Sequence, residues 1–562
     1  MVTTGPVIIV GGGPVGLAAA LELARFNVPT VVVEQREATS WHPKTRNMNT
    51  RTMEIARGWG RTVYERLRGI DTPDGWKSPI RFLRSVVGEQ VGQIESKGFV
   101  GPGPDVSPAV PVMSSQDLME RIYFDAARAT GLVDLRFGHR ALKVLRGQAA
   151  TDAAAAVEVI DQASGETNIL SGAALVAADG VDSMVREELG IVLEGDKGIH
   201  HFINCYFRAD LERHVGERRG VLLFVANENA AGVLQPLDAR GRWLCQIAVR
   251  AEEWRSDVFT KERCQQWIRA AVGVRDLEPE VLSVGRWRMN ATVAQTFVRG
   301  RVILVGDAAH QFPPTGGLGV NTGIQGMHNA MWKLAFLVQG KAGRGLLETY
   351  TTERHPVARW TVEQSLQNHR HVQQIAMAAI AGRESSMDAM DIVTAARRYG
   401  NHLGVEFGSV YGSQAVVPDD TPLPELADAY SDYVPTARPG CRAPHAWLGR
   451  ADESLSTLDL FGPGFTTLTG SEGAAWRDAA RRTSAEFDVP IACYGIGDAG
   501  LEDRDGVFFE RFGIDASGAV LVRPDGYVGW RIPRAGDQND LRRAVGQILD
   551  RDTDAHARTT RR

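Results

Sequence analysis

The sequence predicts an α/β fold that contains a dinucleotide-binding domain of the Rossmann type. Two passages carry this prediction, because each joins an apolar strand to a helix through glycines: one near the N-terminus and one at residues 301–338. A strand-rich stretch between them predicts an additional sheet. With 562 residues, the chain is long enough for two to four domains.

The first element is a short strand, Val7–Val10, which runs directly into a glycine fingerprint. Strong helix formers follow from Leu17 to Arg25, and a second β-branched strand, Thr30–Val33, ends at Glu34. The glycines fit the pattern G-x-G-x-x-G, and Glu34 lies near the offset of roughly 20 residues expected of an acid that accepts ribose hydroxyls. The fingerprint glycines are Gly11, Gly13 and Gly16.

The second passage begins with a buried strand, Val302–Val305, and an acidic turn at Gly306-Asp307. A glycine-rich loop, Pro313–Gly319, precedes a helix that starts near Val320. The helix N-terminus would direct partial positive charge into the loop. Helical spacing is seen in the apolar residues Ile324, Met327, Met331, Leu334, Leu337 and Val338.

A third glycine pattern, Gly495–Gly500, also fits G-x-G-x-x-G. Neither a helix nor a second strand ending in an acid follows it, so we interpret it as a turn. The sequence therefore predicts one dinucleotide fold.

Residues 220–249 predict strands of the additional sheet. Gly220–Val225 is apolar, and Gly232–Val249 has the pattern of a hairpin with a turn at Asp238–Gly241. The pattern does not decide which face of this sheet lines a pocket.

Composition excludes several classes of protein. A net charge of −5 gives no basic footprint for nucleic acid, and no apolar run is long enough for a membrane span. The five cysteines contain no C-x-x-C pair, which disfavours structural zinc and disulfides and suits the cytoplasm. We expect no metal site, and we expect the polar residues 551–562 to form a flexible tail.

Three separated motifs resemble the single-component FAD-dependent aromatic hydroxylases, which are class A flavoprotein monooxygenases with the fold of para-hydroxybenzoate hydroxylase and phenol hydroxylase. The first motif is the fingerprint with Glu34, and the second is Asp179-Gly180 followed by Ser183 and Arg186. The third is Gly306-Asp307 with its glycine-rich loop. Towards the C-terminus, Pro439–His445 and Leu521–Trp530 resemble a thioredoxin-like domain.

The resemblance implies a fold with an FAD domain, an inserted β-sheet substrate domain and a C-terminal thioredoxin-like α/β domain. The FAD domain would combine residues 1–75, 105–190 and 290–360, and the substrate sheet would combine 76–104 and 191–289. Closing helices would occupy 361–415, and the thioredoxin-like domain would occupy 425–550. Without a cysteine pair, that last domain cannot perform dithiol chemistry.

The resemblance also implies the site residues. Asp307 would bond the ribityl chain, and the loop from Pro314 to Asn321 would surround the isoalloxazine ring. Lys44 stands where relatives more often have arginine, which weakens any bidentate phosphate contact. The predicted FAD contacts are Gly11, Gly13, Pro14, Val15, Gly16, Glu34, Gln35, Arg46, Gln116, Asp179, Gly180, Asp307, Pro314, Gly316, Gly317, Leu318, Gly319, Val320 and Asn321. Catalytic candidates are Pro314, Arg46 and His310, and Tyr206 and His42 could join a proton relay.

The implied activity is hydroxylation of an electron-rich phenolic or polyketide-like aromatic. NADPH or NADH would reduce FAD transiently, and a flavin C4a-hydroperoxide formed from O2 would attack the ring. Baeyer–Villiger insertion, epoxidation or oxidative ring cleavage on the same fold is an alternative, as is an FAD-bound regulator or scaffold. The sequence leaves open the substrate, the choice of nicotinamide and a homodimer.

Overall fold

The computed structural model describes residues 5–145, 155–255, 257–380, 396–450, 453–497 and 500–551. Its first core is a six-stranded sheet in the order β17-β18-β11-β1-β2-β7, parallel except for β17. The sheet joins strands that are far apart in the chain. The strands are β1 (Val7–Val10), β2 (Thr30–Glu34), β7 (Val133–Phe137), β11 (Ala174–Ala177), β17 (Val298–Arg299) and β18 (Val302–Leu304).

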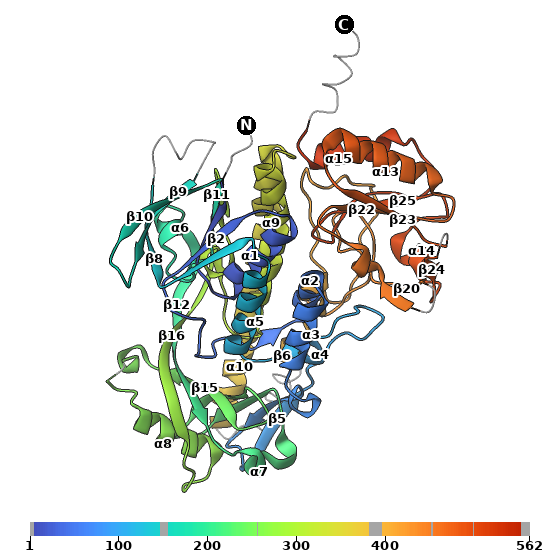
Figure 1. The fold of residues 1–562 in the computed structure, drawn as a ribbon. Helices are drawn as coiled ribbons and strands as arrows, with labels where there is room; N and C mark the ends of the chain where they lie inside the picture. The colour runs from blue at the N-terminus through green and yellow to red at the C-terminus, as the bar shows by residue number, and fades with distance from the viewer. Residues whose placement is uncertain are drawn as a thin grey trace.

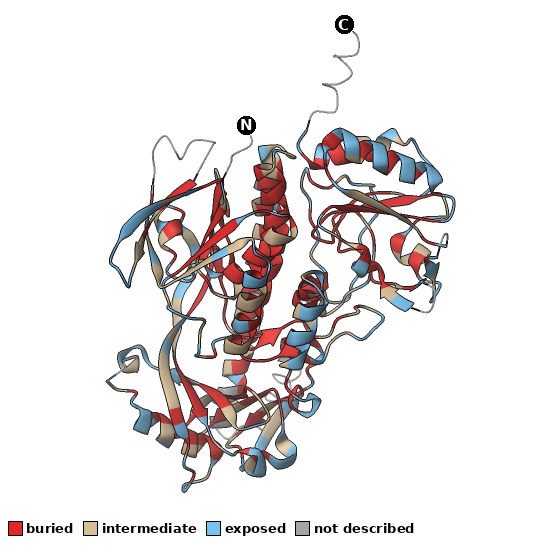
Figure 2. Ribbon diagram, viewed as in Figure 1, coloured by how far each residue is buried: buried red, intermediate tan, exposed pale blue. Residues whose placement is uncertain are grey.

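Helices pack beside this sheet along the centre of the molecule (Figure 1). Helix α1 (Pro14–Arg25) packs against both α5 (Gln116–Ala129) and α9 (Gly319–Val338). Strands β1 and β11 are buried throughout, as expected of strands covered on both faces. Figure 2 shows α9 as almost wholly buried, so it is an internal helix.

A three-stranded antiparallel sheet, which the sequence reasoning did not anticipate, joins this half of the chain. Its order is β10-β9-β8, from β8 (His139–Val144), β9 (Ala155–Asp161) and β10 (Thr167–Gly172). The outer strand β10 is mostly exposed, so the alternation that identifies a half-buried strand is weak there.

An eight-stranded sheet forms the second core, in the order β19-β16-β12-β15-β14-β13-β4-β5. The expected hairpin is present: β14 and β15 are antiparallel, and Asp238 Oδ1 accepts hydrogen bonds from the backbone N–H of Arg240 and Arg242 in the turn. Helix α8 (Lys261–Val272) covers one face. The strands are β4 (Ile80–Leu83), β5 (Gln90–Ile94), β12 (Leu193–Arg208), β13 (Leu222–Ala226), β14 (Ala231–Pro236), β15 (Arg242–Val249), β16 (Glu280–Ala294) and β19 (His310–Gln311).

Shorter elements link the two cores. Strands β3 (Asn47–Met48) and β6 (Val112–Met113) pair beside α2, and the long helix α10 runs from the first core to the second. The linking helices are α2 (Thr50–Gly58), α3 (Arg61–Gly69), α4 (Lys97–Val100), α6 (Met184–Glu188), α7 (Glu212–Val215), α10 (Arg344–Ile380) and α12 (Leu403–Phe407). Five 3-10 turns accompany them, at Asp74–Trp76, Gly216–Arg218, Ala251–Glu253, Gly306–Ala308 and Ala396–Gly400.

The C-terminal part has its own four-stranded sheet, in the order β23-β22-β25-β26, with β22 parallel to β23 and antiparallel to β25. Helices α13 and α15 lie over it with exposed outer faces (Figure 2), an arrangement that suits a thioredoxin-like fold. A small sheet, β21-β20-β24, lies beside it. The elements are β20 (Trp447–Arg450), β21 (Glu453–Ser456), a 3-10 turn (Thr457–Leu460), β22 (Phe465–Thr469), α13 (Ala474–Phe487), β23 (Ile491–Gly495), β24 (Glu502–Asp503), α14 (Phe508–Phe512), β25 (Ala519–Val522), β26 (Val528–Ile532) and α15 (Asn539–Ile548).

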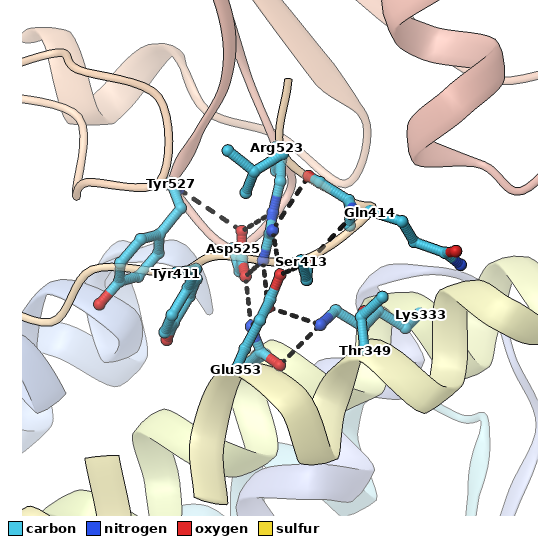
Figure 3. Close-up of polar contacts among 12 residues, drawn as sticks. Lys333, Thr349, Glu353, Tyr411, Ser413, Gln414, Arg523, Asp525 and Tyr527 are labelled. Atoms are coloured by element: carbon cyan, nitrogen blue, oxygen red, sulfur yellow. Dashed lines mark hydrogen bonds and ion pairs between the residues drawn. The ribbon is translucent and has the colours of Figure 1, made fainter. Parts of the chain in front are cut away.

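A buried ionic cluster joins this C-terminal part to α9 and α10 (Figure 3). Glu353 accepts hydrogen bonds from Lys333 and Arg523, both at 2.7 Å, and Asp525 accepts one from Asn329 at 2.9 Å. The four charged side chains are at most 1% exposed. Two positive and two negative groups balance there, which is the condition for burying charge.

The glycine pattern beginning at Gly495 is part of a turn, since β23 ends there and β24 follows at Glu502 without an intervening helix in the described residues. Residues 498–499 and most of the expected tail, 552–562, lie outside the described residues. Among the described residues, every helix is too short or too polar to cross a membrane.

Candidate flavin site and substrate face

The fingerprint turn brings two backbone segments into direct contact. Gly11 has a φ of +107°, and a Cβ there would lie 2.2 Å from the carbonyl oxygen of Ala178. A Cβ on Gly16 would lie 1.9 Å from the carbonyl oxygen of Gly11. Nothing lies within 4 Å of a Cβ built on Gly13, so the turn is open on the side where α1 begins at Pro14. Such an opening at a helix N-terminus suits a phosphate group.

Glu34 ends β2 beside this turn. Its Oε2 accepts a hydrogen bond from the Gly12 N–H at 2.7 Å, and its Oε1 accepts one from the Arg36 side chain at 2.9 Å. Burial alone would raise the pKa of Glu34, but the bonds from Arg36 lower it, so the carboxylate is ionised. Gln35 is exposed next to it.

The second motif caps a short helix. Asp179 accepts hydrogen bonds from the Ser183 hydroxyl at 2.6 Å and from the Val185 N–H at 3.0 Å, which fixes the start of α6. Burial raises its pKa. Gly180 has a φ of +83° with open space at its Cβ position, so its backbone is accessible to a ligand. The Asp179 carboxylate therefore also stabilises the start of α6.

Asp307 lies where the first and third motifs meet. A Cβ on Gly306 would lie 3.1 Å from the Val15 side chain, so the two motifs are in direct contact. Asp307 is exposed at the surface, but the protein atoms packed around its carboxyl desolvate it and raise its pKa to about 6, against the attraction of Lys44. Lys44 is exposed as well. Both groups can therefore reach a polar ligand.

Asn321 holds the glycine-rich loop in place. Its Oδ1 accepts bonds from the Asn49 N–H at 2.9 Å and the Thr52 hydroxyl at 2.7 Å. Its Nδ2 donates to the carbonyl oxygens of Asn47 at 3.0 Å and Gly317 at 2.8 Å. All four positions of the amide are used, so the side chain fastens the loop to α2 and has no hydrogen bond left for a cofactor.

The rest of the loop is a tight turn. The Gly317 N–H donates to the Pro314 carbonyl oxygen at 3.1 Å, and Gly316 and Gly317 have φ values of +99° and +64°. Leu318 is buried, and Val320 is half-buried in the first turn of α9. Only glycine adopts the two consecutive left-handed conformations without strain.

Arg46 is a buried cation beside this loop. It is 8% exposed and donates to the backbone carbonyls of Pro236 and Val221. Burial lowers its pKa to about 9, and its partners in the described structure are neutral oxygens. Arginine keeps its proton in proteins, so the site holds a positive charge that an anionic ligand would stabilise. Two hydrogen bonds fix the Gln116 side chain: its oxygen accepts one from the Thr45 N–H, and its Nε2 donates one to the Glu120 carboxylate.

The catalytic candidates do not form one cluster. His42 Nδ1 lies 2.6 Å from the Ser283 hydroxyl, and the His42 ring faces Tyr206. His310 is elsewhere, packed between Phe297 and Phe312, and burial lowers its pKa to about 3. An imidazole with such a pKa is a poor base near neutral pH.

The sheet register decides which side chains of the second core lie under α8 and which lie on the opposite face. Odd-numbered residues of β12, such as Ile203, Cys205 and Phe207, pack under α8. Side chains alternate along a strand, so the even-numbered residues lie on the opposite face. That face carries His200, Phe202, Asn204 and Tyr206. We call it the substrate face.

Three residues of the site escaped the sequence reasoning. Arg36 bonds Glu34, Asn47 lies against Gly317 with both polar side-chain atoms unpaired in the described structure, and Tyr399 lies close enough to Gly316 for that backbone to lower its pKa against the effect of burial. Arg36 could have been found, because it lies only two residues after the acid of the fingerprint. Asn47 and Tyr399 become neighbours of the loop only through folding, and no local pattern marks them.

These features fit FAD. The open turn at Gly13 and the helix N-terminus suit the pyrophosphate, and the accessible Asp307 suits a ribityl hydroxyl. The unpaired amide of Asn47 and the buried charge of Arg46 suit a polar ring with partial negative charge. Among the described residues, no cluster of histidine, cysteine or acidic side chains is arranged to hold a metal ion.

Comparison with known proteins agrees with this geometry. Residues 4–365 match the model of the FAD binding domain, and residues 436–552 match that of the aromatic-ring hydroxylase C-terminal domain. The chain is 36% identical to tetracenomycin A2 monooxygenase-dioxygenase from Streptomyces glaucescens, with 97% of each chain covered.

Two solved structures share the whole fold. The flavin-dependent monooxygenase PieE, in complex with FAD and substrate, superposes with a TM-score of 0.91 at 32% identity, covering 98% of this chain and 99% of that one. A ternary complex of aklavinone-11 hydroxylase with FAD and aklavinone gives a TM-score of 0.83 at 32% identity, with the same coverage. The chain therefore belongs to the family of FAD-dependent aromatic-ring hydroxylases.

Proposed function

We propose that this enzyme hydroxylates a phenolic ring of a polycyclic, polyketide-like aromatic compound, with O2 as oxidant and NADH or NADPH as reductant. The observation that carries the proposal is the composition of the substrate face, which holds the aromatic pair Phe202 and Trp287 and the unpaired amide oxygen of Asn204. The relatives support the same class of substrate, since one is named for tetracenomycin A2 and another structure contains aklavinone.

The substrate face suits a flat, partly polar ligand. Phe202 and Trp287 lie side by side with ring centroids 5.1 Å apart, and Phe82 stacks on Phe224 at 5.3 Å. Asn204 is 7% exposed, and its Oδ1 has no partner in the described structure. Pockets for small ligands combine apolar walls with a few such polar atoms, which fix the orientation of the ligand.

FAD, when bound, supplies the redox chemistry, accepting a hydride from the nicotinamide and activating dioxygen. The chain contributes binding and electrostatics. Glu34 would accept hydrogen bonds from the ribose of the adenosine half, and Asp307 would accept one from a ribityl hydroxyl. Arg46 would offset negative charge on the reduced ring. The start of α9 at Gly319 adds partial positive charge on the same side. Pro314 would lie beside the ring as part of the loop that excludes water.

The nicotinamide would bind transiently, because the chain contains one dinucleotide fold in its described part. The five cysteines, all free, suit a reducing cytoplasm. The proposed reaction is the same whether the enzyme is a monomer or a homodimer.

The test uses the purified yellow protein. NADH or NADPH oxidation is followed with a panel of phenols and hydroxyquinones, and products are identified by mass. We expect at least one aromatic to accelerate oxidation and to gain one oxygen atom on the ring. Stimulation that yields a ring-opened or ester product would point instead to another oxygen insertion, and a complete absence of stimulation would contradict the proposal.

A further inference from the structure

Two histidines outside the predicted motifs form a pair at the edge of the substrate face. His200 lies on β12 and His369 on α10, with ring centroids 4.8 Å apart and planes inclined at 51°. Gln373, one turn further along α10, places its Nε2 2.8 Å from His200 Nε2. The amide therefore donates to His200 and fixes the orientation of that ring.

The pair lies between two anchors of the glycine-rich loop. On the β12 side, the Gly198 N–H donates to Asn290 at 2.8 Å, and Asn290 donates to Gln311 at 2.7 Å, shortly before the loop begins. On the α10 side, the Thr315 hydroxyl of the loop donates to the Ser365 carbonyl oxygen at 2.6 Å. Ser365 lies one helical turn before His369, so both histidines are on elements fastened to the loop.

His369 is buried and has an unsatisfied nitrogen. The residue is 7% exposed, and its Nε2 has no hydrogen-bond partner in the described structure. Burial and the neighbouring His200 lower its pKa to about 4, so the ring is neutral near pH 7. In the tautomer that carries its proton on Nδ1, Nε2 is a buried acceptor without a partner, which is unfavourable, and a ligand that donates a hydrogen bond would satisfy it.

The second unpaired atom lies on the same face. Asn204 is on β12 with His200, four residues along, so both side chains leave the sheet on the same side. Phe202 lies between them and packs on Trp287. An aromatic ligand on Phe202 would thus meet polar groups at both edges.

We propose that His369 Nε2 accepts a hydrogen bond from a phenolic hydroxyl of the aromatic substrate and thereby selects hydroxylated rings over their ethers. His200 orients His369 from its flank, and Gln373 orients His200. The inference rests on the proposed function and adds the group that recognises the substrate. It would explain why two uncharged imidazoles stand beside the loop that we expect to hold the reactive ring.

The experiment uses the full-length, FAD-loaded protein and measures dissociation constants from the shift of the flavin absorbance. The probes are 1-naphthol and 2-hydroxyanthraquinone, each compared with its O-methyl ether, which lacks the donated hydrogen. The variants are His369→Phe, which keeps a ring without the nitrogen, and His369→Gln, which keeps a polar atom near the position of Nε2. His371→Phe, on the same helix and half-buried, is the matched control.

We expect the wild-type protein and His371→Phe to bind a phenol about tenfold more tightly than its ether, the effect of one net hydrogen bond. His369→Phe should bind both equally, and His369→Gln should restore part of the preference. Flavin content is measured for each variant, so that only loaded protein is compared.

Two failures are distinguishable. If the wild type prefers phenols and His369→Phe keeps the full preference, the role of His369 is wrong while the proposed function stands. If neither phenol shifts the flavin spectrum or stimulates NADH or NADPH oxidation of the wild type, the proposed function and this inference are both contradicted.

Discussion

Asn321 illustrates at the residue scale how a side chain next to the glycine-rich loop can serve the cofactor indirectly. Its amide makes four hydrogen bonds within the protein, two to the start of α2 and two to the backbone at Asn47 and Gly317. The loop's shape therefore depends on a side chain that itself has no bond left to offer. Replacing it should disturb the flavin without removing a flavin contact.

For Asn321→Ala, we expect a loss of on the order of 3 kcal/mol in the free energy of unfolding, because buried groups lose their partners. FAD retention should fall as well. Urea denaturation and flavin absorbance after gel filtration measure the two effects. The exposed Asn539, which bonds Asp537, gives the control Asn539→Ala, expected to change stability by less than about 0.5 kcal/mol. If Asn321→Ala kept its full flavin content, Asn321 would not be needed to hold the glycine-rich loop in its flavin-binding shape.

Asp307 gives a prediction with a defined pH window. Its folded-state pKa is raised to about 6, above the unfolded value of about 3.9, so the folded apoprotein binds this proton more tightly. Stability associated with the protonated carboxyl is fully present below pH ~4 and is lost as pH rises through about 6. The Asp307→Asn variant has no carboxyl to ionise at this position, so it does not lose this stability as the pH rises.

We therefore expect apo Asp307→Asn to melt above apo wild type at pH 8 and by a clearly smaller margin at pH 4.5, while the variant binds FAD more weakly. Differential scanning fluorimetry of flavin-free protein measures the difference between the two proteins, in which other titrating groups cancel. An equal difference at both pH values would show that the carboxyl is not responsible.

The sequence predicts a site residue when the residues around it in the chain determine its environment, and fails when distant segments do. Glu34 and Asp307 follow directly from strand ends next to glycine turns, so their positions could be predicted from spacing alone. His310 could not be judged in this way, because its low pKa arises from Phe297 and Phe312 packing around it. Tyr399 joins the loop from another part of the chain, and His369 meets His200 only across the fold.

At the element scale, α9 shows the limit of apolar periodicity. The pattern predicts a helix with one buried stripe, and Ile324, Met327 and Met331 are indeed buried. The polar residues Asn329 and Lys333 are also buried, at 1% and 0% exposure, because the C-terminal part covers the remaining side of the helix. The sequence pattern of such a helix is amphipathic even though all its faces are buried, because its polar face packs against charged side chains of another segment.

The cluster on that face predicts a large effect of a single substitution. Burial lowers the pKa of Lys333 to about 8 although Glu353 opposes this, and Arg523 and Lys333 keep the pKa of Glu353 low. Glu353→Gln would leave two cations with one carboxylate, Asp525 (Figure 3). We expect a loss of about 3–5 kcal/mol, since breaking a buried ion pair strands a charge.

Urea denaturation at pH 7 measures this loss. The control is Glu65→Gln, which removes the exposed pair with Arg61 on α3 and should change stability by less than about 1 kcal/mol. If the two variants were equally stable, the buried cluster would contribute no more than a surface ion pair.

At the scale of the whole molecule, the two halves share one hydrophobic core. Trp332 and Phe336 of α9 each lie 6.1 Å from the ring of Phe465 in β22. A second contact joins α2 to the C-terminal part, where Arg442 is ion-paired with buried Glu54. Sequence analysis separates these segments into an FAD domain and a thioredoxin-like domain, because their motifs resemble different parts of the hydroxylase family. It could not predict that they would pack as one core.

We expect this shared core to make unfolding of the flavin half and the C-terminal sheet a single event. Hydrogen exchange followed by mass spectrometry, at increasing guanidinium concentrations, compares peptides from β1 and α9 with peptides from β25 and β26. All four should exchange through an opening of the same free energy, because separating the halves would expose Trp332, Phe336 and the ion cluster together. Glu353→Gln should lower that free energy equally in both sets of peptides. If β25 and β26 opened at lower denaturant than α9, the C-terminal part would be an independent unit, and its contacts with α9 would not support the flavin site.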